Sequence, residues 1–79
     1  MTDQELLTIL KTDLQVSSPA LDPYLSQLVR AARDFITTEG ITLTGSYSDE
    51  MLVEMYAAYL YRRRREEKRA DAPHAAVGA

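Results

Sequence analysis

The sequence predicts an all-α protein, a small three-helix bundle with a long C-terminal third helix and a flexible tail. Capping and helix-breaking residues divide the 79 residues into three segments. In each segment the apolar residues recur at the spacing of one helix face. The alternating stretch at residues 41–44 has no second strand nearby with which it could pair, so we expect an extended connection there.

The first helix is predicted to cover about residues 3–14. Thr2 and Glu5 have the spacing of a capping box, in which each side chain bonds the backbone N–H of the other residue. Leucines at positions 6, 7, 10 and 14 follow at helical spacing. Ser17, Ser18 and Pro19 interrupt this pattern and end the segment.

The second helix has two predicted starts, because Ser18 precedes Pro19 and Asp22 precedes Pro23. A regular helix that began at Pro19 would lose one backbone hydrogen bond at Pro23. We therefore expect a short turn at 19 and the main helix from about Pro23 to residue 39. Gly40 is expected to end it in the left-handed conformation.

The third helix is predicted over about residues 49–69. Ser48 has the character of an N-cap, and Asp49 and Glu50 suit the positive end of the helix dipole. Residues 1–69 would then form one helical domain. Residues 70–79 are small and unpatterned, and we expect them to form the flexible C-terminal tail.

Between Met51 and Tyr61, ten of eleven residues are apolar or tyrosine, and the exception is Glu54. A helix that is apolar all round is normally buried all round. Two short neighbouring helices cannot bury it completely, so part of its surface should meet another chain. We assign to that interface Val53, Ala57, Leu60 and Tyr61. The predicted core comprises Leu6, Leu10, Leu25, Leu28, Val29, Ala32, Phe35, Ile36, Leu52, Met55, Tyr56 and Tyr59.

Charge is unevenly distributed along the chain, although the net charge is −3. Residues 1–61 hold three bases against nine acids, whereas residues 62–69 hold six bases against two acids. This basic run fits a solvated helix end, a nucleic-acid contact, or a clamp on the acidic surface of a neighbouring subunit. The last of these would pack basic tip against acidic body around a ring. The interface assignment therefore includes Arg62, Arg63, Arg64 and Arg65.

Catalysis, a cofactor and a metal site are not expected. The chain has no cysteine, and its one histidine, His74, lies in the predicted tail. There is no glycine-rich phosphate loop. No apolar run reaches the roughly 20 residues that a membrane-spanning helix needs, and the acidic start differs from a signal peptide. The chain is therefore expected in the cytoplasm and away from membranes.

Residues 48–64, SDEMLVEMYAAYLYRRR, resemble a characteristic stretch of the head–tail connector (adaptor) proteins of tailed phages. The segments 10–14, 24–36 and 39–43 resemble the same family, so that the resemblance covers about residues 5–65. It implies a subunit of a homo-oligomeric ring beneath the portal. Such a ring extends the DNA channel, touches DNA non-specifically and receives neck and tail completion proteins. The implied location is the virion neck, after assembly in the host cytoplasm.

Two other functions fit the residues. A small nucleic-acid-binding regulator would use the basic run at 62–69 on phosphates, although the acidic body opposes this. A helical interaction module would instead bind a partner helix along its third helix.

Overall fold

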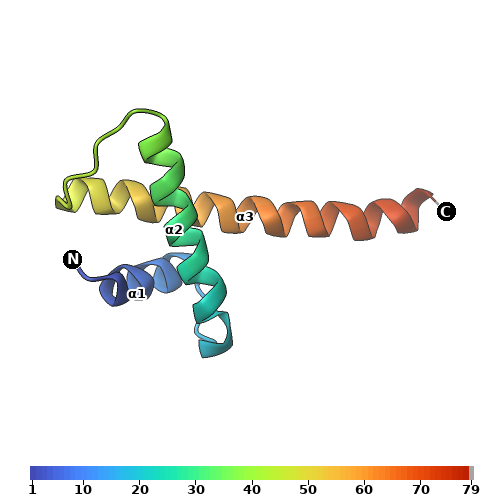
Figure 1. Ribbon diagram of the computed structural model, residues 1–79. Helices are drawn as coiled ribbons and strands as arrows, with labels where there is room; N and C mark the ends of the chain where they lie inside the picture. Colours follow the sequence, from blue (N-terminus) through green and yellow to red (C-terminus); the bar gives the residue numbers. More distant parts are fainter. Residues whose placement is uncertain (79) are drawn as a thin grey trace.

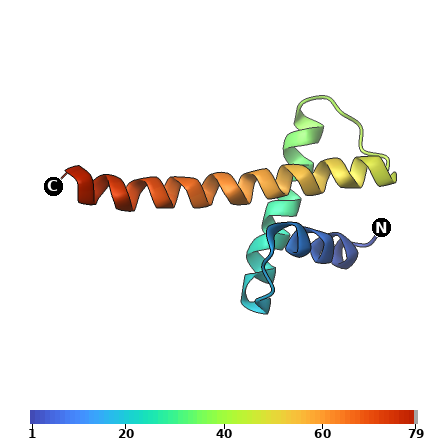
Figure 2. The same ribbon diagram turned by 180° about the vertical axis from the view of Figure 1, so that it is seen from behind.

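The computed structural model describes the backbone of residues 1–78 and the side chains of residues 1–67. The elements are α1 (Asp3–Leu14), a 3₁₀ turn η1 (Pro19–Leu21), α2 (Asp22–Thr38) and α3 (Tyr47–Gly78). α1 lies beside the first part of α3, and α2 crosses them (Figures 1 and 2). The all-α prediction is confirmed for this part of the chain, in which no strand forms. α3 continues to Gly78, nine residues past its predicted end at 69, and the flexibility of residues 70–79 stays a prediction.

The start of α1 follows from the capping box. The Thr2 hydroxyl accepts a hydrogen bond from the backbone N–H of Glu5 at 3.1 Å, and the Glu5 carboxylate accepts one from the backbone N–H of Thr2 at 2.8 Å. Both bonds satisfy N–H groups that have no partner inside the helix. Hydrogen bonding to the Glu5 carboxylate, first from the Thr2 backbone N–H and then from the Thr2 side chain, holds the pKa of this carboxyl below its ordinary value.

A short turn does precede α2. The Ser18 hydroxyl accepts a hydrogen bond from the backbone N–H of Ala20 at 3.3 Å and so caps η1, and α2 then carries Pro23 in its first turn. The predicted start at about Pro23 is one residue late, because Asp22 is already the first residue of α2 and does not cap it. Its carboxylate instead accepts a hydrogen bond from Lys11 at 2.7 Å, which ties α2 to α1.

The predicted cap at Ser48 is also wrong, because α3 begins two residues earlier than expected, at Tyr47. The capping hydroxyl belongs to Ser46, which accepts a hydrogen bond from the backbone N–H of Asp49 at 3.2 Å. Asp49 in turn accepts bonds from the backbone N–H and the hydroxyl of Thr44, at 2.7 and 2.9 Å. These bonds lower the pKa of Asp49 and fasten the extended connection to the first turn of α3.

Left-handed residues end α1 and α2. At Gly40, with φ of +94°, the backbone N–H bonds the carbonyl of Thr37, and the N–H of the next residue bonds the carbonyl of Ile36. This is the six-residue cap expected of a helix-ending glycine. The same pair of bonds ends α1, but there the left-handed residue is Gln15, with φ of +58°. Sequence inspection identified the glycine and missed the glutamine.

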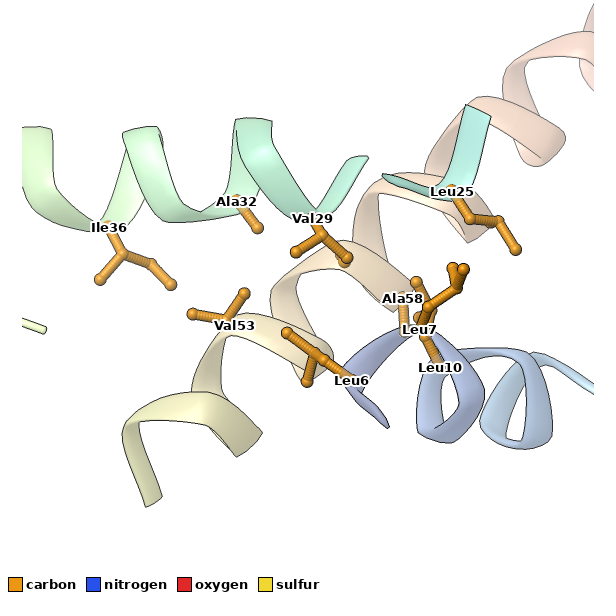
Figure 3. Packing of buried hydrophobic residues seen from close by; sticks show 10 residues of the cluster. Leu6, Leu7, Leu10, Leu25, Val29, Ala32, Ile36, Val53 and Ala58 are labelled. Atoms are coloured by element: carbon orange, nitrogen blue, oxygen red, sulfur yellow. The ribbon is translucent and has the colours of Figure 1, made fainter. Parts of the chain in front are cut away.

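The core lies where the three helices meet (Figure 3). In that view Val53 of α3 lies between Ile36 of α2 and Leu6 of α1. The buried apolar residues of the described part are Leu6, Leu7, Leu10, Leu25, Val29, Ala32, Ile36, Val53, Ala57 and Ala58. Burial was correctly predicted for Leu6, Leu10, Leu25, Val29, Ala32 and Ile36.

The predicted orientation of α3 is wrong. Four predicted core residues are exposed, with exposed fractions of 51% for Phe35, 38% for Leu52, 64% for Met55 and 51% for Tyr59. Leu28 and Tyr56 are half-buried at the edge of the core.

The orientation of α3 differs from the prediction because of the composition of its buried face. This face carries Glu50 and Glu54, both almost fully buried, beside the small residues Ala57 and Ala58. Val53 and Ala57 of this face were predicted to form an interface with another chain, and the larger residues of the opposite side were predicted to form the core. Small side chains on this face allow α1 and α2 to approach α3 closely. The larger side chains of the opposite face would prevent this approach if they were turned towards the core. No helix of the described chain is long and apolar enough to span a membrane.

The left-handed caps predict opposite effects for two substitutions. Gly40→Ala should lower the free energy of unfolding by about 1 kcal/mol, because an L side chain is strained at this φ. A Cβ at this position would meet no atom within 4 Å, so the loss reports conformation alone. Gln15→Gly should raise the free energy by about 0.5 kcal/mol for the converse reason. Urea unfolding followed by circular dichroism measures both, and a destabilised Gln15→Gly variant would contradict this account.

The orientation of α3 is tested by a pair of truncations. Val53→Ala should destabilise the protein by about 2 kcal/mol, because Val53 is fully buried and its removal leaves a cavity. Met55→Ala should change stability by no more than about 0.5 kcal/mol, because that side chain is mostly exposed. Equal losses in dilute solution would show that α3 presents a different face to the core.

Candidate interaction surface

An exposed apolar and aromatic surface runs along the outside of α3. We call it the aromatic face and define it as Leu52, Met55, Tyr56 and Tyr59 of α3 with Phe35 of α2. The α3 members are three or four residues apart and so share one side of the helix. The Phe35 and Tyr56 rings stack with centroids 5.8 Å apart, and the Tyr56 and Tyr59 rings meet edge to face at 5.8 Å.

The composition of the aromatic face is that of a contact surface. Tyrosine, phenylalanine and methionine are enriched where proteins bind one another. Single exposed apolar residues are common and need no explanation, but contiguous ones mark interaction sites. Here the contacts between rings join the exposed side chains of two helices into one surface, which makes this face the strongest candidate for an interface in the described chain.

A groove continues this surface between α2 and α3. We call it the basic groove; its volume is about 300 Å³. Its lining residues are Tyr24, Leu28, Ala31 and Phe35 of α2 and Leu60, Arg63, Arg64 and Glu67 of α3. Most of these side chains are apolar. Arg63 forms an ion pair with Glu67 at 3.5 Å, whereas Arg64 forms none with the described side chains.

A second hollow, of about 280 Å³, is lined by Leu21, Tyr24, Tyr61, Arg64 and Arg65. The rings of Tyr24 and Tyr61 lie 6.5 Å apart across it. Tyr24 and Arg64 belong to both hollows. The start of α2 and the arginine run of α3 therefore present apolar surface with positive charge beside it.

The predicted interface residues divide into three groups. Val53 and Ala57 have no exposed surface and lie in the protein's own core. Their predicted assignment to an interface with another chain is therefore wrong. Leu60 and Tyr61 are half-buried and line the basic groove and the second hollow, respectively. All four arginines, Arg62 to Arg65, are exposed.

Sequence inspection missed the aromatic face because its residues had been assigned to the core. The available signal was the pair Ala57 and Ala58, whose small side chains suit close helix contact better than those of Met55 and Tyr59. Glu54 lies three and four residues before Ala57 and Ala58, and Glu50 lies four residues before Glu54, so all four share one side of the helix. Both glutamates could therefore have been read as charges with partners on the packed face.

Arg62 differs from the other arginines because it takes part in a cluster of charges between α1 and α3. Its guanidinium donates a hydrogen bond to Asp13 at 3.3 Å. The buried carboxyl of Glu54 lies against the same Asp13. Burial, followed by the hydrogen bond and the negative charge of Asp13, raises the pKa of Glu54 to about 7. The hydrogen bond from protonated Glu54, together with Arg62, lowers the pKa of Asp13.

A comparison with protein-family models, a search of curated proteins and a search of solved structures each found no match for this chain. Among the described residues, no group of three or more histidine, cysteine, aspartate or glutamate side chains is placed to hold a metal ion.

The acid cluster predicts a pH-dependent effect of Glu54→Gln. The folded-state pKa of Glu54, about 7, lies above its ordinary value of 4.5, so the folded protein holds a proton that the unfolded chain releases between these values. The free energy of unfolding therefore falls as pH rises from about 4.5 to 7, and glutamine removes this loss. We expect the variant to be more stable than the wild type by about 1 to 2 kcal/mol at pH 8.

The stability difference between the variant and the wild type should shrink towards pH 5. The lowered pKa of Asp13 makes the free energy of unfolding rise with pH, but only below the ordinary Asp pKa of 3.8, which lies outside this pH range. Thermal unfolding of both proteins at pH 5, 6, 7 and 8 measures the effect. A difference that does not depend on pH would show that Glu54 stays ionised in the fold.

Proposed function

We propose that this protein is a structural subunit of a phage head–tail connector ring, which docks on the portal, extends the DNA channel and receives neck and tail proteins. The aromatic face is the observation that carries the proposal. The segment that builds most of it, residues 48–64, is also the segment that resembles the connector family. Both observations support the proposal of a contact surface on α3.

A ring subunit needs a lateral contact with its neighbours. The half-exposed side chains of the aromatic face supply on the order of a few hundred Å² of apolar surface. A stable interface buries about 800 Å² on each partner. The contact should therefore extend beyond this face, and the adjoining basic groove is the nearest surface that offers further apolar area.

The arginines add a second kind of contact. Arg63, Arg64 and Arg65 are exposed, and their guanidinium groups suit carboxylates or phosphates. In this proposal the arginine part of α3 extends away from the crossing with α2 (Figure 1), and the chain beyond residue 69 serves as its tail. The arginines would then meet the portal, an adjacent subunit or the phosphates of DNA in the channel.

A nucleic-acid-binding regulator is the second candidate, because Arg64 and Arg65 form no ion pair with the described residues. The acidic body opposes this function, since residues 1–61 hold nine acids against three bases. Such a protein would bind duplex DNA with an affinity that falls steeply with salt.

Assembly on a portal tests the proposal. The purified chain is mixed with the portal ring encoded in the same genome, and the products are examined by light scattering after size exclusion and by electron microscopy. We expect a ring of subunits on the portal. The double variant Met55→Ser, Tyr59→Ser should not form this complex, because the aromatic face is lost, while its helix content stays unchanged.

Thr12→Ala, at an exposed position of α1, serves as the matched control and should assemble normally. A chain that remains monomeric at high concentration and does not bind the portal would contradict the connector function. Salt-dependent binding of duplex DNA that is lost in Arg64→Gln, without portal binding, would favour the regulator.

A further inference from the structure

We propose that the loop between α2 and α3, residues 39–46, docks into the basic groove of a second copy of this chain. This inference deepens the connector function, on which it rests, by naming a contact between loop and groove that adds to the aromatic face where neighbouring subunits meet. The partner is thus identical in sequence, and each subunit would offer its loop to one neighbour and its groove to the other.

The loop end of the molecule is acidic with an apolar tip. Asp34 and Glu39 are exposed there, and the last turn of α2 carries no basic residue. The carbonyl end of α2 adds the negative pole of the helix dipole at the same place. Ile41, which follows, is 45% exposed. An exposed isoleucine beside carboxylates that have no ion pair among the described residues is complementary to a groove that is apolar with guanidinium groups at its edge.

The loop is already held in shape at both ends. The cap at Gly40 bonds Ile41 back to the carbonyl of Ile36, and Thr44 bonds the carboxylate of Asp49 at the other end. A segment fixed by such bonds loses less conformational freedom when it binds, so more of the contact energy appears as affinity.

The basic groove has the complementary chemistry. Leu28, Ala31 and Leu60 provide apolar surface for an aliphatic side chain such as Ile41. Arg64, which has no ion pair with the described side chains, lies at the same groove and would face a carboxylate of the loop end, Asp34 or Glu39, while Arg63 there already pairs with Glu67. Guanidinium–carboxylate contacts of this kind are among the stronger hydrogen bonds in proteins.

Within one molecule the loop lies away from the arginine end of the groove. The loop joins α3 on one side of the crossing with α2, whereas the arginine part of α3 extends from the other side (Figures 1 and 2). The contact would therefore join different surfaces of two copies, head to tail. Contacts of this type close into a ring when the rotation between subunits permits.

Disulfide trapping tests the contact directly, because the chain has no cysteine of its own. A tagged Ile41→Cys chain is mixed with an untagged Ala31→Cys chain under mild oxidation, with and without portal. We expect the mixed disulfide to form roughly tenfold faster than between Ile41→Cys and Thr8→Cys, because docking raises the local thiol concentration. Thr8 is exposed on α1 and lies outside the basic groove.

Charge reversal provides the second arm. Adding Arg64→Glu to the Ala31→Cys chain should reduce the rate of disulfide formation to that of the Thr8 control pair. Adding Glu39→Arg to the Ile41→Cys chain should then restore the faster rate. Unchanged circular dichroism shows that each variant folds.

A rate for the Ala31–Ile41 pair no faster than for the Thr8 pair, with and without portal, would overturn the proposal. Rings that still assemble on the portal in that case would leave the connector function standing. Rapid trapping of the Ala31–Ile41 pair without any portal binding would instead support the contact between loop and groove and contradict the connector function.

Discussion

The structure depends on one constraint, which is that a single face of α3 must contact both α1 and α2. Val53, Ala57 and Ala58 meet this constraint because their small side chains let two helices approach the same stretch of backbone. A consequence is that the larger residues of α3 turn outward. Leu52, Met55 and Tyr59 are therefore exposed because the packing that forms the core excludes them, and the same packing creates the aromatic face.

Two buried glutamates on that same face fix how α3 sits against its neighbours. Glu50 pairs with Arg33 of α2 at 3.1 Å, and Arg33 also reaches Asp3 of α1 at 3.4 Å. Glu54 lies against Asp13, which Arg62 contacts. Buried charges contribute little net stability, since their desolvation offsets their attraction. Removing one partner is costly, however, and a rotated α3 would leave both glutamates unpaired. We infer that these contacts select the orientation of the helix more than they stabilise the fold.

Local signals in the sequence were sufficient for the elements and insufficient for the orientation of α3. The capping box at Thr2, the proline at 23 and the glycine at 40 act within one helical turn, so their roles could be read directly. Gln15 takes the left-handed conformation although nothing in its side chain favours it, because the chain must turn there towards α2. The face of α3 depends on partners distant in sequence, Arg33 and Asp13, and a periodicity argument treats a paired glutamate as a solvated one.

The packing also divides the arginine run. Arg62 is turned towards the body and contacts Asp13, so part of its charge is already neutralised within the subunit. Arg63 is partly neutralised by Glu67, whereas Arg64 lies between two apolar hollows and pairs with no described side chain. A surface for DNA would gain from several free charges along one line, because each phosphate contact adds to affinity independently of sequence. At an apolar groove, the Arg64 guanidinium is suited to one carboxylate beside one aliphatic side chain, and this is why we propose a protein partner for this part of α3.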